Sequence, residues 1–384
     1  MTSRERVLAA LEHREPDRVP VDLWLTAEAY RNLRSYLGMP VKETYPPGST
    51  TWSMDCRAEL DLVERLGVDI VRIGSRPPGG KGLTWLPDGT CVDEWGVRRR
   101  KVEFKTGTYL EIIDPPLKDA TIEDLNDYPW PDPHDPAVVE GLREQARFIR
   151  ENTPYAIHAQ FGRGGIYEQA KYLRGEEQLY MDCAMNPEFV LALHEKLCQI
   201  EMEFNRVGIE AIGEYVDILR LSPEDLGTQT STQLSPRMHE EMVRPFFKRS
   251  FGEAKRLLQE KNPRGKIQYH SCGAIYPLMR GLIDDGMDIF DPLQLRCKDF
   301  EPARLKADFG SDITFLGGID VQQTLPLGTP AEVREEVRVR IKEMAPGGGY
   351  ILASSHRLQP DIPPANVLAM YEAAKEYGKY PIKL

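Results

Sequence analysis

The chain has 384 residues, of which 41% are hydrophobic and 28% charged, as in a soluble globular protein long enough for one large α/β barrel or two ordinary domains. Its 49 basic and 60 acidic residues give a net charge of -11, which argues against nucleic-acid binding. No apolar run approaches the roughly 20 residues of a membrane helix, and the N-terminus lacks the apolar core of a signal peptide. We therefore expect a cytoplasmic protein whose six scattered cysteines are thiols or metal ligands.

The first part of the chain is predicted to combine a helical extension with an inserted β-element. Thr2 to Glu5 resembles a capping box that opens an amphipathic N-terminal helix. The proline- and glycine-rich residues 44–54 are expected to form a loop over a cleft. Residues 83–113 alternate in polarity around two turn signals, which predicts an inserted antiparallel β-hairpin or meander of two or three strands.

Short apolar runs alternate with segments of helical periodicity along most of the chain. The predicted strands begin near residues 19, 68, 155, 216, 266, 287, 313 and 349. Eight strands separated mostly by helices predict a (β/α)8 TIM barrel, and we expect residues 1–384 to form a single domain of this kind. An open doubly wound sheet is the alternative, but it requires a glycine-rich nucleotide loop that the sequence lacks.

The strand near residue 266 ends in the sequence His270-Ser271-Cys272-Gly273. Side chains two residues apart on a strand point to the same side, so His270 and Cys272 face one pocket if the extended geometry persists. An imidazole beside a thiol suits a soft divalent metal, above all zinc. A core histidine near a buried cysteine is the alternative. The histidines expected on the surface are His13, His134, His194 and His239.

Polar residues also gather at the ends of the other predicted strands, where TIM barrels carry their chemistry. His356 follows the last strand and would complete a zinc site with His270 and Cys272, leaving a fourth position for substrate. The residues expected to orient substrate or move protons are Glu224, Asp225 and Asp320. The residues expected to bind substrate are Gln160, Arg163, Asp291 and Gln294. Helix capping or loop stabilisation is the alternative role for any one of them.

Five segments together resemble the uroporphyrinogen decarboxylase (URO-D) superfamily over nearly the whole chain: TSRERVLAALEHREPDRVPV, PEDLGTQTSTQLSPRMHEEMVRPFFKR, YHSCGAIYPLMRGLIDDGMDIFDPLQ, ITFLGGIDVQQTLPLGTPAEVREEV and APGGGYILASSHRLQPDIPPANV. The resemblance implies a (β/α)8 barrel, in agreement with the strand count. True decarboxylases of this superfamily carry an arginine-bearing RQAGRY-type segment, whereas the matching region here reads VDLWLTAEAYRNL. Without those arginines, a substrate with many carboxylates lacks its cationic partners.

The resemblance is closer to the corrinoid-dependent methyltransferase branch, whose members bind zinc through an H-x-C pair and a distant cysteine after the last strand. His270 and Cys272 match the pair, and His356 stands at the position of the distant cysteine. Zinc accepts either residue type. No D-x-H-x-x-G corrinoid-binding motif occurs, so the corrinoid (cobalamin) would arrive on a separate protein.

The function that this resemblance implies is a zinc-dependent methyltransferase that exchanges a methyl group between a small molecule and a corrinoid protein. One alternative is a uroporphyrinogen decarboxylase-type carboxy-lyase acting on a porphyrinogen or another carboxylated substrate, with Arg76 or Arg163 as the cationic side chains. A second alternative is a non-catalytic binding subunit of a corrinoid complex. The sequence leaves a homodimer open.

Overall fold

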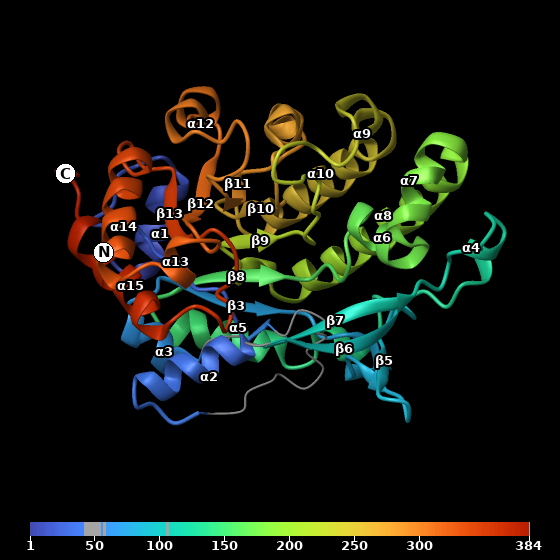
Figure 1. The fold of residues 1–384 in the computed structure, drawn as a ribbon, viewed down its shortest axis with the longest axis horizontal. Coiled ribbons are helices and arrows are strands. Elements are labelled where there is room, and N and C mark those ends of the chain that lie inside the picture. Colours follow the sequence, from blue (N-terminus) through green and yellow to red (C-terminus); the bar gives the residue numbers. More distant parts are fainter. Residues whose placement is uncertain (42–54, 57–58, 105–106, 384) are drawn as a thin grey trace.

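Seven parallel strands form the central sheet of the computed structural model, which describes residues 1–41, 55–56, 59–104 and 107–383 (Figure 1). The predicted loop at 44–54 lies outside these described residues. The strands are β3 (Ile70–Gly74), β8 (Ala156–Gln160), β9 (Ile218–Arg220), β10 (Lys266–His270), β11 (Ile289–Leu293), β12 (Thr314–Ile319) and β13 (Tyr350–Ser354). They neighbour one another in chain order, as the strands of a TIM barrel do.

Residues 19–22 occupy the eighth position, between the two edges of this sheet. Val21 forms a parallel bridge with Leu352 of β13, and the Asp69 N–H donates to the Val21 carbonyl at 2.9 Å beside β3. The segment expected as a full strand at 18–24 is therefore a short extended stretch, partly because Pro20 has no N–H to donate. With this correction, the prediction of an α/β TIM-barrel fold is confirmed.

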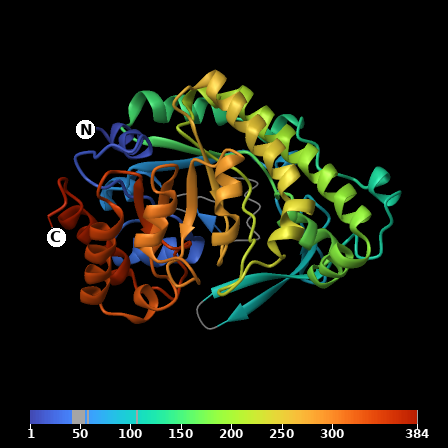
Figure 2. The same ribbon diagram turned by 90° about the horizontal axis from the view of Figure 1, so that it is seen from above.

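Helices lie outside the ring of strands (Figures 1 and 2). They are α1 (Ser3–Leu11), α2 (Ala27–Tyr36), α3 (Leu60–Leu66), α4 (Asp124–Asp127), α5 (Leu142–Asn152), α6 (Tyr167–Arg174), α7 (Glu176–Met185), α8 (Pro187–Ile212), α9 (Pro236–Met242), α10 (Arg244–Lys261), α11 (Met279–Asp284), α12 (Pro302–Phe309), α13 (Thr324–Leu327), α14 (Pro330–Met344) and α15 (Pro364–Tyr377). Within the described ranges, no helix is both long and apolar enough to cross a membrane.

The inserted β-element is a four-stranded antiparallel meander rather than one of two or three strands. It consists of β4 (Thr84–Trp85), β5 (Thr90–Val92), β6 (Arg98–Phe104) and β7 (Gly107–Asp114), and a separate short pair is β1 (Leu25–Thr26) with β2 (Asp55–Cys56). The buried pair Arg99 and Asp93, with 3.2 Å between guanidinium and carboxylate, stabilises the meander internally. An ion pair of 2.6 Å between Glu94 and Arg163 ties it to the loop after β8.

Helix α1 closes the amino-terminal end of the barrel. Its predicted capping box is present, since the Glu5 N–H donates to the Thr2 hydroxyl at 3.2 Å and the Thr2 N–H donates to the Glu5 carboxylate at 2.8 Å. Its apolar face lies against inward-pointing strand residues in one buried cluster: Val7, Leu11, Ile70, Ala156, Ile218, Ile289, Leu316, Ile351 and Ala353. This cluster fills the floor of the barrel, as side chains do in small closed barrels.

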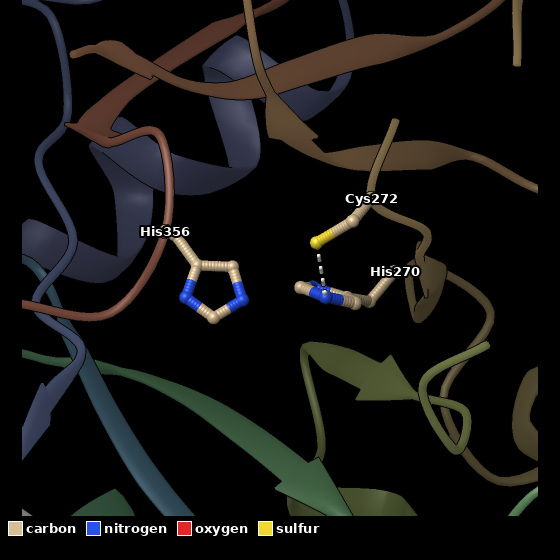
Figure 3. Close-up of side chains that lie close together, drawn as sticks. All are labelled: His270, Cys272 and His356. Atoms are coloured by element: carbon tan, nitrogen blue, oxygen red, sulfur yellow. Dashed lines mark hydrogen bonds between the residues drawn. The ribbon is translucent and has the colours of Figure 1, made fainter. Parts of the chain in front are cut away.

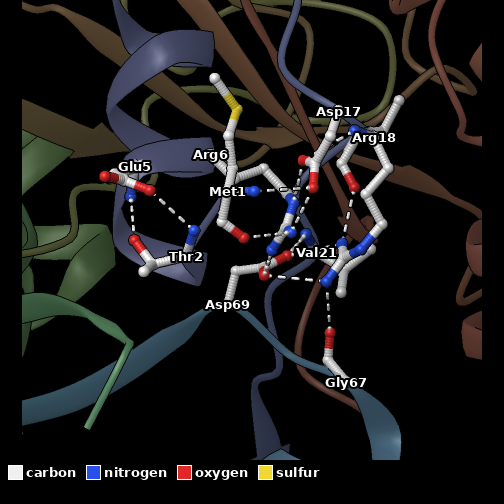
Figure 4. Close-up of polar contacts among 10 residues, drawn as sticks. Met1, Thr2, Glu5, Arg6, Asp17, Arg18, Val21, Gly67 and Asp69 are labelled. Carbon is white, nitrogen blue, oxygen red and sulfur yellow. Dashed lines mark hydrogen bonds and ion pairs between the residues drawn. The ribbon is translucent and has the colours of Figure 1, made fainter.

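Buried ion pairs attach α1 to the same end of the barrel (Figure 4). Asp69, which is 0% exposed, accepts from Arg6 at 2.6 Å and from Arg18 at 2.8 Å. It also accepts from the Val21 N–H at 2.9 Å. These bonds satisfy the buried carboxylate and join the N-terminal helix, the closing segment and the start of β3.

Two of the histidines expected on the surface are buried instead. His194 of α8 is 0% exposed with Nδ1 2.8 Å from the Met242 carbonyl, and His239 of α9 is 3% exposed. Helix α8 packs against α5, α6 and α7 as well as against α9 and α10, so more than one of its faces is covered. Burial lowers the pKa of each imidazole to about 4.

Candidate metal centre

His270, Cys272 and His356 meet at the carboxyl end of the barrel (Figure 3), and their ligand atoms all lie within 4.8 Å of one another. The Cys272 sulfur is 3.6 Å from Nε2 of His270. Tetrahedral zinc, with bonds of about 2.0–2.3 Å, separates its ligand atoms by roughly 3.4–3.6 Å. The His270–Cys272 pair already has this spacing, and the ligand atom of His356 lies within 4.8 Å of both.

The backbone after β10 places the cysteine beside the histidine. The Glu224 N–H donates to the His270 carbonyl at 3.0 Å, which holds the end of the strand against the loop after β9. Gly273 follows with a φ of +96°, and a Cβ at this position would lie 2.3 Å from the carbonyl carbon of Gly227. Only glycine tolerates this turn and this close approach, so the H-x-C-G order is a backbone requirement as well as a ligand pattern.

Asp291 orients the imidazole of His270. Its Oδ2 lies 2.9 Å from Nδ1 of His270 and accepts from the Gln268 amide at 3.1 Å, which leaves Nε2 of the histidine facing the pocket. Desolvation alone would raise the pKa of Asp291, but His270 and the Arg220 guanidinium hold it well below its usual range. Carboxylate–histidine pairs of this kind accompany metal-ligating histidines in most proteins.

The protonation of the other two side chains suits a metal ligand set. Desolvation, with smaller contributions from His270 and Arg357, lowers the pKa of His356 to about 3, so its imidazole is neutral and has a lone pair to donate. Desolvation and then the Asp225 carboxylate raise the pKa of the Cys272 thiol well above its usual range. A dication would have to displace that proton. Two imidazoles and one thiolate fit the donor set of zinc.

Trp24 packs against both ligand histidines, and sequence reasoning missed it. Its ring centroid lies 5.0 Å from that of His356 and 5.5 Å from that of His270. The guanidinium of Arg220 lies 4.9 Å from the same ring, and those of Arg357 and Arg72 lie 5.8 and 5.9 Å away. Trp24 ends the first predicted strand, so the rule that identified the polar candidates would have found it if applied to aromatic residues.

Three further predicted residues lie around the centre. Asp225 places Oδ1 3.8 Å from Nε2 of His270 and accepts from the Cys272 N–H at 3.2 Å. Gln294 directs its amide nitrogen to the Cys272 sulfur at 3.6 Å. Gln160 accepts from Arg220 at 2.9 Å. The structure therefore brings these side chains to the barrel mouth, and their roles toward a substrate stay predictions.

The remaining predicted residues make structural contacts. Glu224 is buried, and its two carboxylate oxygens accept from backbone N–H groups at 2.5 and 2.6 Å at the start of α6. Arg163 pairs with Glu94 of the meander. Asp320 accepts from Arg296 at 2.5 Å and from three N–H groups at the start of α13. Asp320 and Arg296 also line a cavity of about 160 Å³ that shares Gln294 with the metal centre.

Known proteins resemble this chain in sequence and in fold. A family model described as uroporphyrinogen decarboxylase (URO-D) matches residues 96–377. The uroporphyrinogen decarboxylase of Alkalilimnicola ehrlichii is 22% identical over an alignment 384 residues long, which covers 97% of this chain and 93% of that protein. The structure of a methyltransferase from Methanosarcina mazei covers 98% of this chain and 99% of its own, with a TM-score of 0.65 and 17% identity. At that identity the structural match establishes the fold.

Proposed function

The chain belongs to the uroporphyrinogen decarboxylase family, and we propose that within it the protein is a zinc-dependent methyltransferase that exchanges a methyl group with a separate corrinoid protein. One observation carries the proposal: His270, Cys272 and His356 converge within 4.8 Å at the mouth of the barrel. The RQAGRY-type arginine segment of true decarboxylases has no counterpart here. The barrel of the Methanosarcina mazei methyltransferase is a compatible scaffold.

Each side chain around the centre would have its own role in the reaction. Zinc, when bound by the three ligands, would act as a Lewis acid that polarises or deprotonates the small-molecule methyl donor or acceptor. Asp291 holds His270 so that Nε2 faces the pocket. Asp225, partly exposed at 3.8 Å from that nitrogen, is placed to take a proton from an incoming acceptor. Trp24 packs against both imidazoles and shields them from water.

Metal content is the first test. Protein purified without chelator should contain about one zinc per chain, and Cys272→Ala should lose most of it. Cys198→Ala is the matched control, because Cys198 is a buried thiol in α8 that donates to the Phe246 carbonyl, far from the ligand set in the fold. Near-zero zinc in all three proteins would contradict the proposal.

Methyl exchange is the second test. Methylcobalamin with a nucleophilic small molecule such as a thiol as methyl acceptor, or cob(I)alamin with a methylated small molecule as donor, serves as the probe, and interconversion of the two corrinoids is followed by absorbance. We expect a spectral change that needs zinc and is lost in Cys272→Ala. Corrinoid-protein binding without any turnover would instead favour a binding subunit.

A carboxy-lyase is the second candidate because three arginines surround Trp24: Arg72, Arg220 and Arg357. They would supply cationic partners for a carboxylated substrate. The two arginines expected in this role are paired with carboxylates, Arg76 with Glu140 at 2.9 Å and Arg163 with Glu94 at 2.6 Å. Two of the three around Trp24 also have carboxylate partners, since Arg72 pairs with Asp22 and Arg220 lies 3.8 Å from Asp291. Uroporphyrinogen turnover that persists after chelation would favour this candidate.

A further inference from the structure

The amide of Gln294 bridges the backbone and the sulfur of the H-x-C-G segment. Its Oε1 accepts from the Gly273 N–H at 2.8 Å, and its Nε2 lies 3.6 Å from the Cys272 sulfur. A backbone N–H can only donate, so this contact identifies the amide oxygen and leaves the NH2 group facing the sulfur. The Cys297 thiol, 3.8 Å from the same oxygen, supports this orientation.

The contact gives Cys272 a polar partner from the loop after β11, the strand that also carries the partner of His270. Asp291 lies within β11 and Gln294 directly follows it, so one strand end carries both groups. The two differ in kind, because Asp291 accepts from an imidazole whereas Gln294 donates to a sulfur.

We propose that Gln294 is a positioning residue for Cys272: its amide, bonded to the Gly273 N–H on one side and directed to the sulfur on the other, aims the sulfur at the two imidazoles. This inference rests on the proposed zinc site. It replaces the substrate-binding role expected for Gln294 with a role toward the ligand. Outer partners of metal ligands typically change metal affinity by about 10–100-fold.

Gln294→Glu separates this role from a structural one. The carboxylate retains an oxygen for the Gly273 N–H but has no donor for the sulfur. Cobalt(II) serves as the probe, because its thiolate charge-transfer band reports on the Co–S bond, and zinc affinity is measured by competition with a chromophoric chelator. Gln322→Glu is the matched control, since Gln322 lines the neighbouring cavity and donates to Gln229 rather than to Cys272.

We expect Gln294→Glu to shift the cobalt band and to weaken zinc binding at least about tenfold, with Gln322→Glu unchanged. Gln294→Asn, which withdraws the donor by one methylene, should show the same direction of change and serves as the readout if the glutamate variant does not fold. An unaltered band and affinity in a folded variant would overturn the inference while leaving the zinc site intact. A wild-type protein without any thiolate band would overturn both.

Discussion

Nδ1 of His270 and Oδ2 of Asp291 are 2.9 Å apart in a buried pair, and this contact determines which ring nitrogen points into the barrel mouth. Because Nδ1 is engaged, Nε2 faces Cys272. The same carboxylate has Nε of Arg220 at 3.8 Å, so its charge is balanced from a second side. The contact with Asp291 thus holds the imidazole of His270 in one orientation.

Asp291→Asn should weaken zinc binding by about 10–100-fold, because the imidazole loses the anionic partner that orients it. Competition with a chelator of known affinity measures the effect. Asp312→Asn is the control, since Asp312 pairs with Arg280 on the surface. Equal affinity in both variants would contradict the assigned role of Asp291.

His356 is expected to tolerate replacement by another zinc ligand. His356→Cys should retain zinc, whereas His356→Ala should lose much of it while the barrel stays folded, because the residue follows β13 rather than lying in the apolar core. Metal analysis combined with thermal unfolding distinguishes the two. Full zinc retention in the alanine variant would remove His356 from the ligand set.

Trp24 should report metal binding by fluorescence. Its ring lies 5.0 and 5.5 Å from the two ligand imidazoles, so cobalt(II) in the centre would quench its emission strongly. The chain has five tryptophans, and Trp24→Phe should remove the quenched component while leaving most of the remaining emission. Quenching that is unchanged in Trp24→Phe would place the cobalt elsewhere.

Stability should fall as the pH is lowered from about 6.5 to about 4. The pKa of buried His194 is lowered from 6.5 to about 4, so in this interval the unfolded chain binds more protons than the folded one. The loss approaches about 1.4 kcal/mol per pH unit for one such histidine. His194→Gln should flatten the profile measured by denaturant unfolding, whereas His134→Gln, at an exposed position, should not.

Asp69→Asn should destabilise the fold without affecting metal content. The change leaves Arg6 and Arg18 without their buried counter-charge, and breaking a buried pair from one side costs about 3–5 kcal/mol. Asp17→Asn, which removes a partly exposed partner of the same Arg6, should cost under about 1 kcal/mol. Urea unfolding compares the two, and equal losses would contradict the central role of Asp69.

The barrel was predictable because short apolar runs alternate with segments of helical periodicity along most of the chain. The runs expected near 68 and 155 correspond to β3 and β8, which begin at Ile70 and Ala156. Periodicity does not show which neighbours a helix has, so the burial of His194 escaped prediction. Periodicity also takes no account of a single proline, which is why the segment around Pro20 was expected as a full strand.

The convergence of His270, Cys272 and His356 was predictable for a related reason: strand ends distant in sequence share one barrel mouth. The partners of those residues were not predictable, because sequence spacing contains no side-chain directions. Asp291 and Gln294 were both expected to bind substrate, which stays a prediction; their contacts with His270 and with the Cys272 sulfur were not foreseen.

The apolar cluster that contains Val7 and Leu11 fills the floor of the barrel, at the opposite end from the candidate metal centre. In the proposed reaction a small molecule and a corrinoid-bearing partner would then both approach the site from the carboxyl ends of the strands. The position of α1, at the far end of the barrel from the candidate site, would therefore determine the side from which both reactants approach.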